Sequence, residues 1–146
     1  MVPVLEQVLE KYPHNVKLVF KNFPLSSHNF AMKAAVAAMA AESQGKFWEF
    51  YDLLFKNYNR LNDQKIQEIA LAVGLNLEEY EKKKNDPAIT RQINQDLIEG
   101  QRAGVRGTPT VFINGIRLRN RSFQGFQEAI DNQLEKLGKT AAKPSS

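Results

Sequence analysis

The chain has 146 residues, of which 42% are apolar and 25% are charged, and it carries a formal net charge of +4. This composition suits one soluble domain with a proper core. No apolar run approaches the ~20 residues that span a membrane, no basic and aromatic ladder favours nucleic-acid binding, and the start lacks the features of a signal peptide.

A short helix and a strand are predicted at the start of the chain. Apolar residues fall at helical spacing over residues 3–12, and Pro13 ends the run. The following residues are mostly β-branched, aromatic or aliphatic, which predicts a buried strand over residues 16–23, ended by Pro24. A helix, a short turn and a strand form the second half of a β–α–β unit, so we expect the first strand of that unit to be missing.

The middle of the sequence predicts a block of helices. An Ala-rich helix is expected over residues 28–43, with Ser26 or Ser27 as its cap, and Gly45 breaks it. The next helix, residues 46–58, is predicted to pack its aromatic side chains in the core. Three further helices are predicted at residues 63–73, at 76–84 behind a capping box that begins at Asn76, and from Asp86-Pro87 to about Ala103.

The last part of the sequence predicts a hairpin and a helix. Residues 110–113 read as a strand, Asn114-Gly115 as a two-residue turn and residues 116–118 as the returning strand. Ser122 caps a final helix that presents Phe126, Ile130, Leu134 and Leu137 on one face. The polar residues 139–146 are predicted to be a flexible tail.

Together these elements predict an α/β architecture in a single domain, residues 1–138, with an all-helical insertion at about 28–103. Four patches of sequence then point to a family by their order. They are Lys21-Asn22-Phe23-Pro24-Leu25, His28 with the Ala-rich helix behind it, Gly45-Lys46-Phe47-Trp48-Glu49-Phe50, and Gly104-Val105-Arg106-Gly107-Thr108-Pro109-Thr110-Val111-Phe112-Ile113-Asn114-Gly115. Over residues 3–138 the sequence resembles the DsbA-like branch of the thioredoxin-fold thiol–disulfide oxidoreductases.

The resemblance implies a thioredoxin-like fold and a substrate-binding loop. Thr108-Pro109 would form a cis peptide bond, and the backbone of Thr108 would offer hydrogen bonds to an extended protein or peptide substrate. Gly107 would allow the substrate chain to approach closely. The alternative is a proline that merely leads into a strand.

The sequence departs from the family in one respect, since it contains no cysteine. Family members react through a Cys-x-x-Cys pair at a helix N-terminus, which would precede the segment that begins at Val2. We therefore expect a chain truncated at its N-terminal side, without the front strand of the sheet. That strand would lie between residues 16–23 and residues 110–113. Its absence predicts a gap, a distorted direct pairing of these two segments, or a slot filled by another chain in a homodimer or strand-swapped oligomer.

Other chemistry finds little support in the sequence. His14 and His28 are the only histidines, and no further ligands stand at metal-binding spacing. The serines have no nucleophile motif or His–Asp partners, so Ser26, Ser27 and Ser122 are interpreted as helix caps. We expect no catalytic residue within the chain, and no metal or cofactor.

Three functions remain open. The first is a DsbA-like protein disulfide oxidoreductase domain that is inactive in this cysteine-free form. The second is a non-catalytic module that binds extended peptides, and the third is a glutathione-dependent transferase or isomerase of the same branch, which retention on a glutathione column would reveal. The resemblance implies mostly periplasmic or extracytoplasmic proteins, but the sequence leaves the compartment open.

Overall fold

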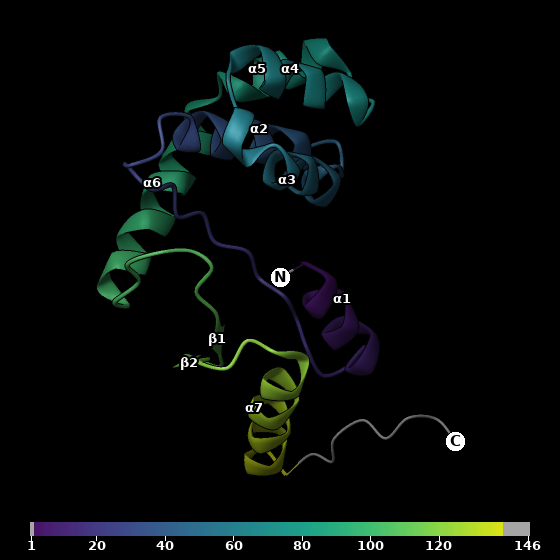
Figure 1. Cartoon of the computed structure of the whole chain (residues 1–146), viewed down its shortest axis with the longest axis vertical. Helices are drawn as coiled ribbons and strands as arrows, with labels where there is room; N and C mark the ends of the chain where they lie inside the picture. The colour runs from purple at the N-terminus through teal and green to yellow at the C-terminus, as the bar shows by residue number, and fades with distance from the viewer. Residues whose placement is uncertain (1, 139–146) are drawn as a thin grey trace. The chain divides into compact units, whose positions relative to one another are not determined.

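The computed structural model describes residues 2–138, and these contain seven α-helices, one short 3-10 helix and two β-strands (Figure 1). The contacts divide the chain into two units. We call Met1–Phe20 with Gly107–Ser146 the hairpin unit, and Lys21–Arg106 the helical unit. The predicted insertion falls within the helical unit, and the predicted tail, residues 139–146, lies outside the described residues.

The hairpin unit consists of two helices and one two-stranded antiparallel sheet. Its elements are α1 (Val2–Lys11), β1 (Phe112–Ile113), β2 (Ile116–Arg117) and α7 (Phe123–Lys136). Helix α1 packs against α7, and their shared core consists of Val8, Tyr12, Phe126, Ile130 and Leu134. The unit is thus a single two-stranded hairpin with one helix on either side of it in the sequence.

The hairpin follows its sequence signal closely. Asn114 and Gly115 have φ angles of 49° and 80°, the left-handed values that a tight two-residue turn requires. Phe112 pairs with Arg117, and a hydrogen bond of 2.8 Å from Leu118 N–H to the Val111 carbonyl extends the ladder by one position. The predicted strands are therefore confirmed, although each is shorter than predicted.

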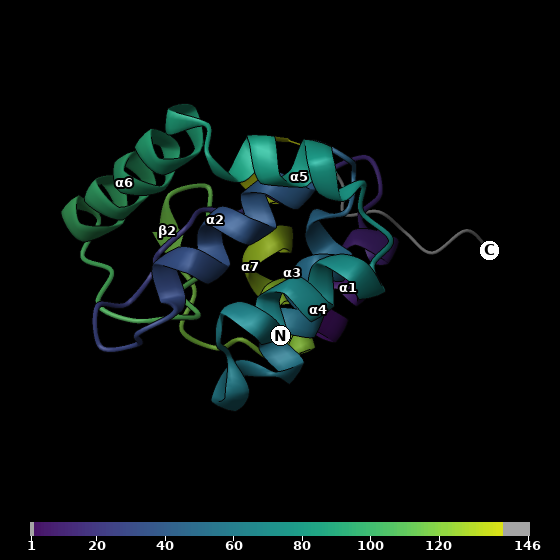
Figure 2. The same cartoon turned by 90° about the horizontal axis from the view of Figure 1, so that it is seen from above.

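The helical unit is arranged around α2 (Ala31–Glu42), which contacts every other α-helix of the unit. The other helices are α3 (Phe47–Lys56), α4 (Asp63–Ala72), α5 (Leu77–Lys84) and α6 (Pro87–Arg102), with the 3-10 helix Tyr58–Arg60 after α3. Figure 1 shows α2 beside α3, and Figure 2 shows α5 along α2. Four alanines of α2 are buried, and such small side chains let neighbouring helices approach closely.

The predicted strand over residues 16–23 is wrong. These residues are extended but belong to neither strand of the sheet. A strand needs a neighbour for its backbone groups, and the sheet in residues 2–138 ends at β1 and β2. The Asn22 N–H is instead taken by the Asp96 carboxylate of α6, at 3.0 Å, and the Asn22 side-chain amide donates to the same oxygen at 2.9 Å.

Two other predictions need correction in the helical unit. Ser26 and Ser27 lie in a turn before α2, whose N-cap is Phe30 without a side-chain hydrogen bond. The aromatic helix is only partly core: Phe47, Phe50 and Leu54 are buried, whereas other large members of the set are exposed, namely Trp48, Phe55 and Tyr58. With Tyr51, this set has seven large apolar or aromatic residues. They cover more than one face of the helix, and only one stripe of a helix can face the core.

The predicted caps of the later helices are mostly confirmed. The side chains of Asn76, Asp86 and Ser122 each accept a backbone hydrogen bond at the start of α5, α6 and α7. The capping box at Asn76 is only half formed, because the Asn76 N–H donates to the side chain of Gln44, at 2.8 Å.

Candidate functional site

The loop Gly107-Thr108-Pro109 lies directly before β1 in the hairpin unit. The Thr108–Pro109 peptide bond is cis, as the resemblance implied. Thr108 and Pro109 are exposed, and Gly107 is half-buried. The three residues are therefore placed together on the surface, at the point where the chain enters the hairpin.

The side chains of Thr110 and Arg121 each donate a hydrogen bond to a carbonyl of this loop. The Thr110 hydroxyl donates to the Gly107 carbonyl at 2.7 Å. The Arg121 guanidinium donates through Nη1 to the Pro109 carbonyl oxygen. Both carbonyls of the loop that flank Thr108 are thus engaged within the unit. The sequence analysis missed Arg121 because its partner lies across the hairpin, and only the pairing register brings the two together.

The backbone of Thr108 itself is open. Among residues 2–138 no hydrogen bond uses its N–H or its carbonyl. A Cβ placed on Gly107 would meet no atom within 4 Å, so the chain itself does not require glycine there. Within the hairpin unit, this edge therefore has free backbone groups at Thr108 and open space beside Gly107.

The start of α7 fixes the position of the residues that face the loop. A Cβ on Gly125 would lie 2.2 Å from the Asn120 carbonyl oxygen, so only glycine fits at this close approach. The Ser122 hydroxyl accepts from the Gly125 N–H at 3.1 Å, and the Asn120 side chain accepts from the Ser122 N–H at 3.1 Å. These contacts position Arg121, which lies between Asn120 and Ser122.

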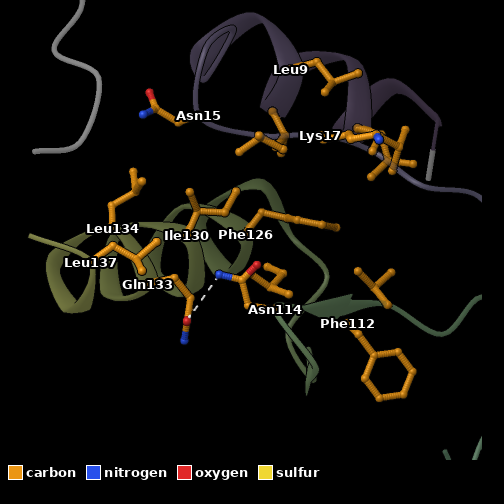
Figure 3. Close-up of a pocket in the computed structure, with 16 residues that line it drawn as sticks. Leu9, Asn15, Lys17, Phe112, Asn114, Phe126, Ile130, Gln133, Leu134 and Leu137 are labelled. Atoms are coloured by element: carbon orange, nitrogen blue, oxygen red, sulfur yellow. Dashed lines mark hydrogen bonds between the residues drawn. The ribbon is translucent and has the colours of Figure 1, made fainter. Parts of the chain in front are cut away.

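An apolar groove runs through the hairpin unit behind the loop. It has a volume of about 170 Å³ and is lined on one side by residues 15–18 and on the other by residues 111–114. Figure 3 shows Phe126, Ile130 and Leu134 of α7 facing the segment that carries Leu9 of α1. The groove lies between the two segments that were predicted to flank a front strand, and among the described residues these segments do not pair with each other.

The two rims of the groove differ. Leu18 lines the rim formed by the extended segment and is 36% exposed, and the next residue, Val19, is 61% exposed. On the other rim, Phe112 points away from α7, and Asn114 Nδ2 donates to the Gln133 side chain at 3.4 Å (Figure 3). One rim thus consists of β1 and the turn that follows it, which is hydrogen-bonded to α7 through Asn114. The other rim is a chain segment that belongs to neither strand.

One titratable group of the hairpin unit, Tyr12, has a shifted pKa. Burial, and then the hydrogen bond of 2.7 Å to Asp131, raise the pKa of Tyr12, which places this phenol in its neutral form in the core. Within residues 2–138 no three His, Asp or Glu side chains gather in a way that could hold a metal ion. His14 and His28 are both exposed.

Comparison with known sequences identifies relatives over most of the chain. Residues 1–131 match the profile of a family described as DSBA-like thioredoxin domain. The "probable disulfide bond formation protein D" of Bacillus cereus is 29% identical over 92% of this chain and 67% of its own length. The Na⁺/H⁺ antiporter NhaA 3 of Salinispora tropica is 34% identical over 79% of this chain, which amounts to only 18% of the antiporter.

No helix within residues 2–138 has both the length and the apolar character to cross a bilayer.

Among solved structures, a thioredoxin-like oxidoreductase from Silicibacter pomeroyi superposes with a TM-score of 0.78 at 26% identity, over 92% of this chain and 77% of its own. The thiol–disulfide exchange protein alpha-DsbA2 from Wolbachia pipientis gives 0.76 at 20% identity, over 90% of this chain and 72% of its own, which is evidence for the fold alone.

Proposed function

The chain belongs to the family of DSBA-like thioredoxin domains, that is, to the DsbA-like thiol–disulfide oxidoreductases, and from that premise we propose that residues 1–146 supply substrate binding for thiol–disulfide exchange but not the reacting thiols. The observation that carries the proposal is the open edge at Thr108, where the backbone is exposed and unused within the described chain. The composition supports its second half, because the chain contains no cysteine.

The binding step follows from the geometry of the loop. An extended substrate segment lies alongside Thr108, accepting from its N–H and donating to its carbonyl, as one strand adds to another. The neighbouring carbonyls of Gly107 and Pro109 are already engaged by Thr110 and Arg121, so they hold the loop in shape rather than compete for the substrate. Gly107 leaves room for the substrate backbone.

The exchange step needs a thiolate that these residues do not contain. In thiol–disulfide exchange a thiolate attacks one sulfur of a disulfide, the other sulfur leaves as a thiolate, and a mixed disulfide remains until a second thiolate resolves it. In this proposal both attacking sulfurs belong to polypeptide outside residues 1–146. The chain by itself therefore binds substrate without turnover, which makes it a peptide-binding module when it is studied alone.

The proposal is tested by titrating the chain with an eight-residue uncharged extended peptide in a calorimeter, beside an insulin-reduction assay with dithiothreitol. We expect saturable binding and no acceleration of insulin reduction. Gly107→Val should weaken binding at least about tenfold, the loss of one well-placed contact region, because the added side chain occupies the space left for the substrate. Since that space is empty in the chain alone, Gly107→Val should fold normally.

Thr90→Val, on the exposed surface of α6, is the matched control for an added apolar surface. It should bind the peptide like the unaltered chain. Turnover of insulin by the 146-residue chain would refute the inactive part of the proposal, and undiminished binding by Gly107→Val would refute the placement of the substrate at this loop.

The expected homodimer or strand-swapped oligomer stays a prediction attached to the groove. The exposed side chains of Leu18, which lines the groove, and of the adjacent Val19 support it, because an extended segment without a strand partner can pair with a strand of another chain. Sedimentation equilibrium over a range of concentrations checks it: a mass that rises from 16.6 kDa towards twice that value supports association, and a constant mass of one chain excludes it.

A further inference from the structure

The segment that begins with the loop Gly107-Thr108-Pro109 and runs into α7 has an uneven distribution of charge. From Gly107 to Gln127 the sequence contains three arginines, Arg117, Arg119 and Arg121, and no acidic residue or lysine. All three arginines are exposed. The acidic residues of the described hairpin unit lie on α1 and α7, outside this segment.

These arginines are not neutralised within the part of the chain that the structure describes. The ion pairs formed among residues 2–138 are all made by lysines, and none involves Arg117, Arg119 or Arg121. Arg121 uses one of its five N–H donors on the Pro109 carbonyl. Each guanidinium therefore keeps donors and a full charge for a group from outside.

The register of the hairpin brings this charge to the loop. Phe112 pairs with Arg117, and Leu118 bonds to Val111, so Arg119, at a bend, comes one residue after the last position bonded to β1 and its preceding residue. The hydrogen bond from Arg121 to Pro109 shows that the two chain segments are still adjacent beyond that point. The arginines thus follow the loop on one side, while the open edge of Thr108 marks where an extended chain would lie.

We propose that the three arginines select acidic side chains in an extended peptide bound along Thr108, an inference that rests on the proposed function and names its substrate class. The spacing favours an extended peptide over a compact anion. Arg117 lies in β2, and Arg119, at a bend, and Arg121 follow it at every second residue, while carboxylates at every second residue of an extended peptide stand roughly 6–7 Å apart and offer a matching series of charges. Guanidinium groups also match carboxylates in geometry, through paired N–H donors.

The test uses three eight-residue peptides that differ only at alternate positions, which hold Glu, Gln or Lys. Calorimetric titration at low salt should show the Glu peptide binding about twofold to tenfold more tightly than the Gln peptide, the effect of one or two exposed ion pairs. The Lys peptide should bind most weakly. The preference should shrink as salt is raised, because exposed charges are screened.

The double variant Arg117→Gln/Arg119→Gln should lose the preference for Glu while it keeps the affinity for the Gln peptide. Arg121 is left in place, because it also holds the loop. The control Arg60→Gln/Arg91→Gln removes the same charge from exposed positions of the helical unit and should keep the preference.

Equal affinity for the Glu and Gln peptides, or a preference that survives in Arg117→Gln/Arg119→Gln, would overturn the inference. Failure of the proposed function looks different, since then none of the three peptides would bind and Gly107→Val would have no effect to measure. The last titration uses a short DNA duplex in place of the peptides. Duplex binding that is lost in Arg117→Gln/Arg119→Gln but kept in Gly107→Val would show that the arginines bind nucleic acid and would overturn the peptide assignment.

Discussion

The helical unit and the hairpin unit differ in how far each satisfies its own backbone. In the helical unit the helices close their hydrogen bonds internally, and side chains such as Asn62, Asn76 and Asp86 accept from the first free N–H groups. In the hairpin unit a two-stranded ladder stands beside an extended segment that pairs with neither strand, and that segment exposes Leu18 and Val19.

This difference shows why the two units offer different surfaces. A helix needs only its own residues, whereas a strand needs a neighbour on each side before its polar groups and its apolar face are covered. The helical unit is therefore self-sufficient, and the hairpin unit presents both the open edge at Thr108 and the apolar groove. We expect ligand effects in the hairpin unit, and the largest stability effects wherever a buried polar contact is broken.

The largest stability effect is expected in the helical unit, at the buried Asp96. Its carboxylate accepts from the backbone and side chain of Asn22, and from the Gln92 side chain at 2.8 Å. Asp96→Ala leaves the two buried donors of Asn22 without an acceptor and should lower the free energy of unfolding by about 3 kcal/mol. Urea denaturation followed by circular dichroism measures this loss.

Glu99→Gln is the control for that measurement. Glu99 lies three residues after Asp96 on α6 and pairs with Lys21 at 3.1 Å, but it is exposed. An exposed ion pair contributes little, so Glu99→Gln should unfold at nearly the same urea concentration as the unaltered chain. If Glu99→Gln costs as much as Asp96→Ala, the buried contact to Asn22 is not what fixes the extended segment on α6.

A smaller effect is expected in the hairpin unit from Gly125→Ala. The new Cβ would lie 2.2 Å from the Asn120 carbonyl oxygen, and the backbone must shift to relieve the overlap. We expect a loss of about 1–3 kcal/mol, the usual cost of overpacking. Gly107→Ala places the same methyl group in open space and should change stability by less than about 0.5 kcal/mol. Equal losses at the two glycines would contradict the contrast between the closed start of α7 and the open loop.

The smallest of these effects is expected at Tyr12. Tyr12→Phe removes the hydrogen bond to Asp131 and should cost about 1 kcal/mol at neutral pH. Because the fold raises the pKa of Tyr12 above its ordinary 10.0, its contribution is fully present below about pH 10 and is lost at higher pH, where the unfolded tyrosine ionises first.

Unfolding free energies measured between pH 8 and pH 11.5, by the same urea method, check this sign. Tyr12→Phe should show a shallower alkaline decline than the unaltered chain, and a remaining decline is expected from Tyr80, whose pKa is raised by burial to about 12. A decline that is as steep in Tyr12→Phe as in the unaltered chain would be inconsistent with the raised pKa.

Sequence reasoning succeeded where the determinant is local. Asn114-Gly115 sets the turn, and Asp86-Pro87 and Ser122 set the starts of α6 and α7, because a cap or a turn depends on residues within about four positions. The order of elements around these signals was enough to predict a hairpin and a block of helices, and the family resemblance of the sequence patches added the thioredoxin-like fold and the cis bond at Thr108-Pro109.

It failed where the determinant is distant in the sequence. Residues 16–23 have strand-like composition, but a strand exists only with a partner, and Asp96 takes the Asn22 N–H from 74 residues away. Arg121 was missed for the same reason, since its role depends on the fold of the hairpin. The exposure of Trp48 and Phe55 depends on which face of α3 the other helices cover, which residue type alone does not reveal.

The most direct test of the central claim is a heteronuclear NMR titration of the ¹⁵N-labelled chain with the uncharged extended peptide. We predict that the amide signal of Thr108 shifts most, followed by signals of residues 107–121, and that signals of α2 to α5 in the helical unit stay in place. Shifts confined to residues 21–106, or saturable binding that leaves Thr108 unmoved, would contradict the placement of the substrate on the hairpin unit.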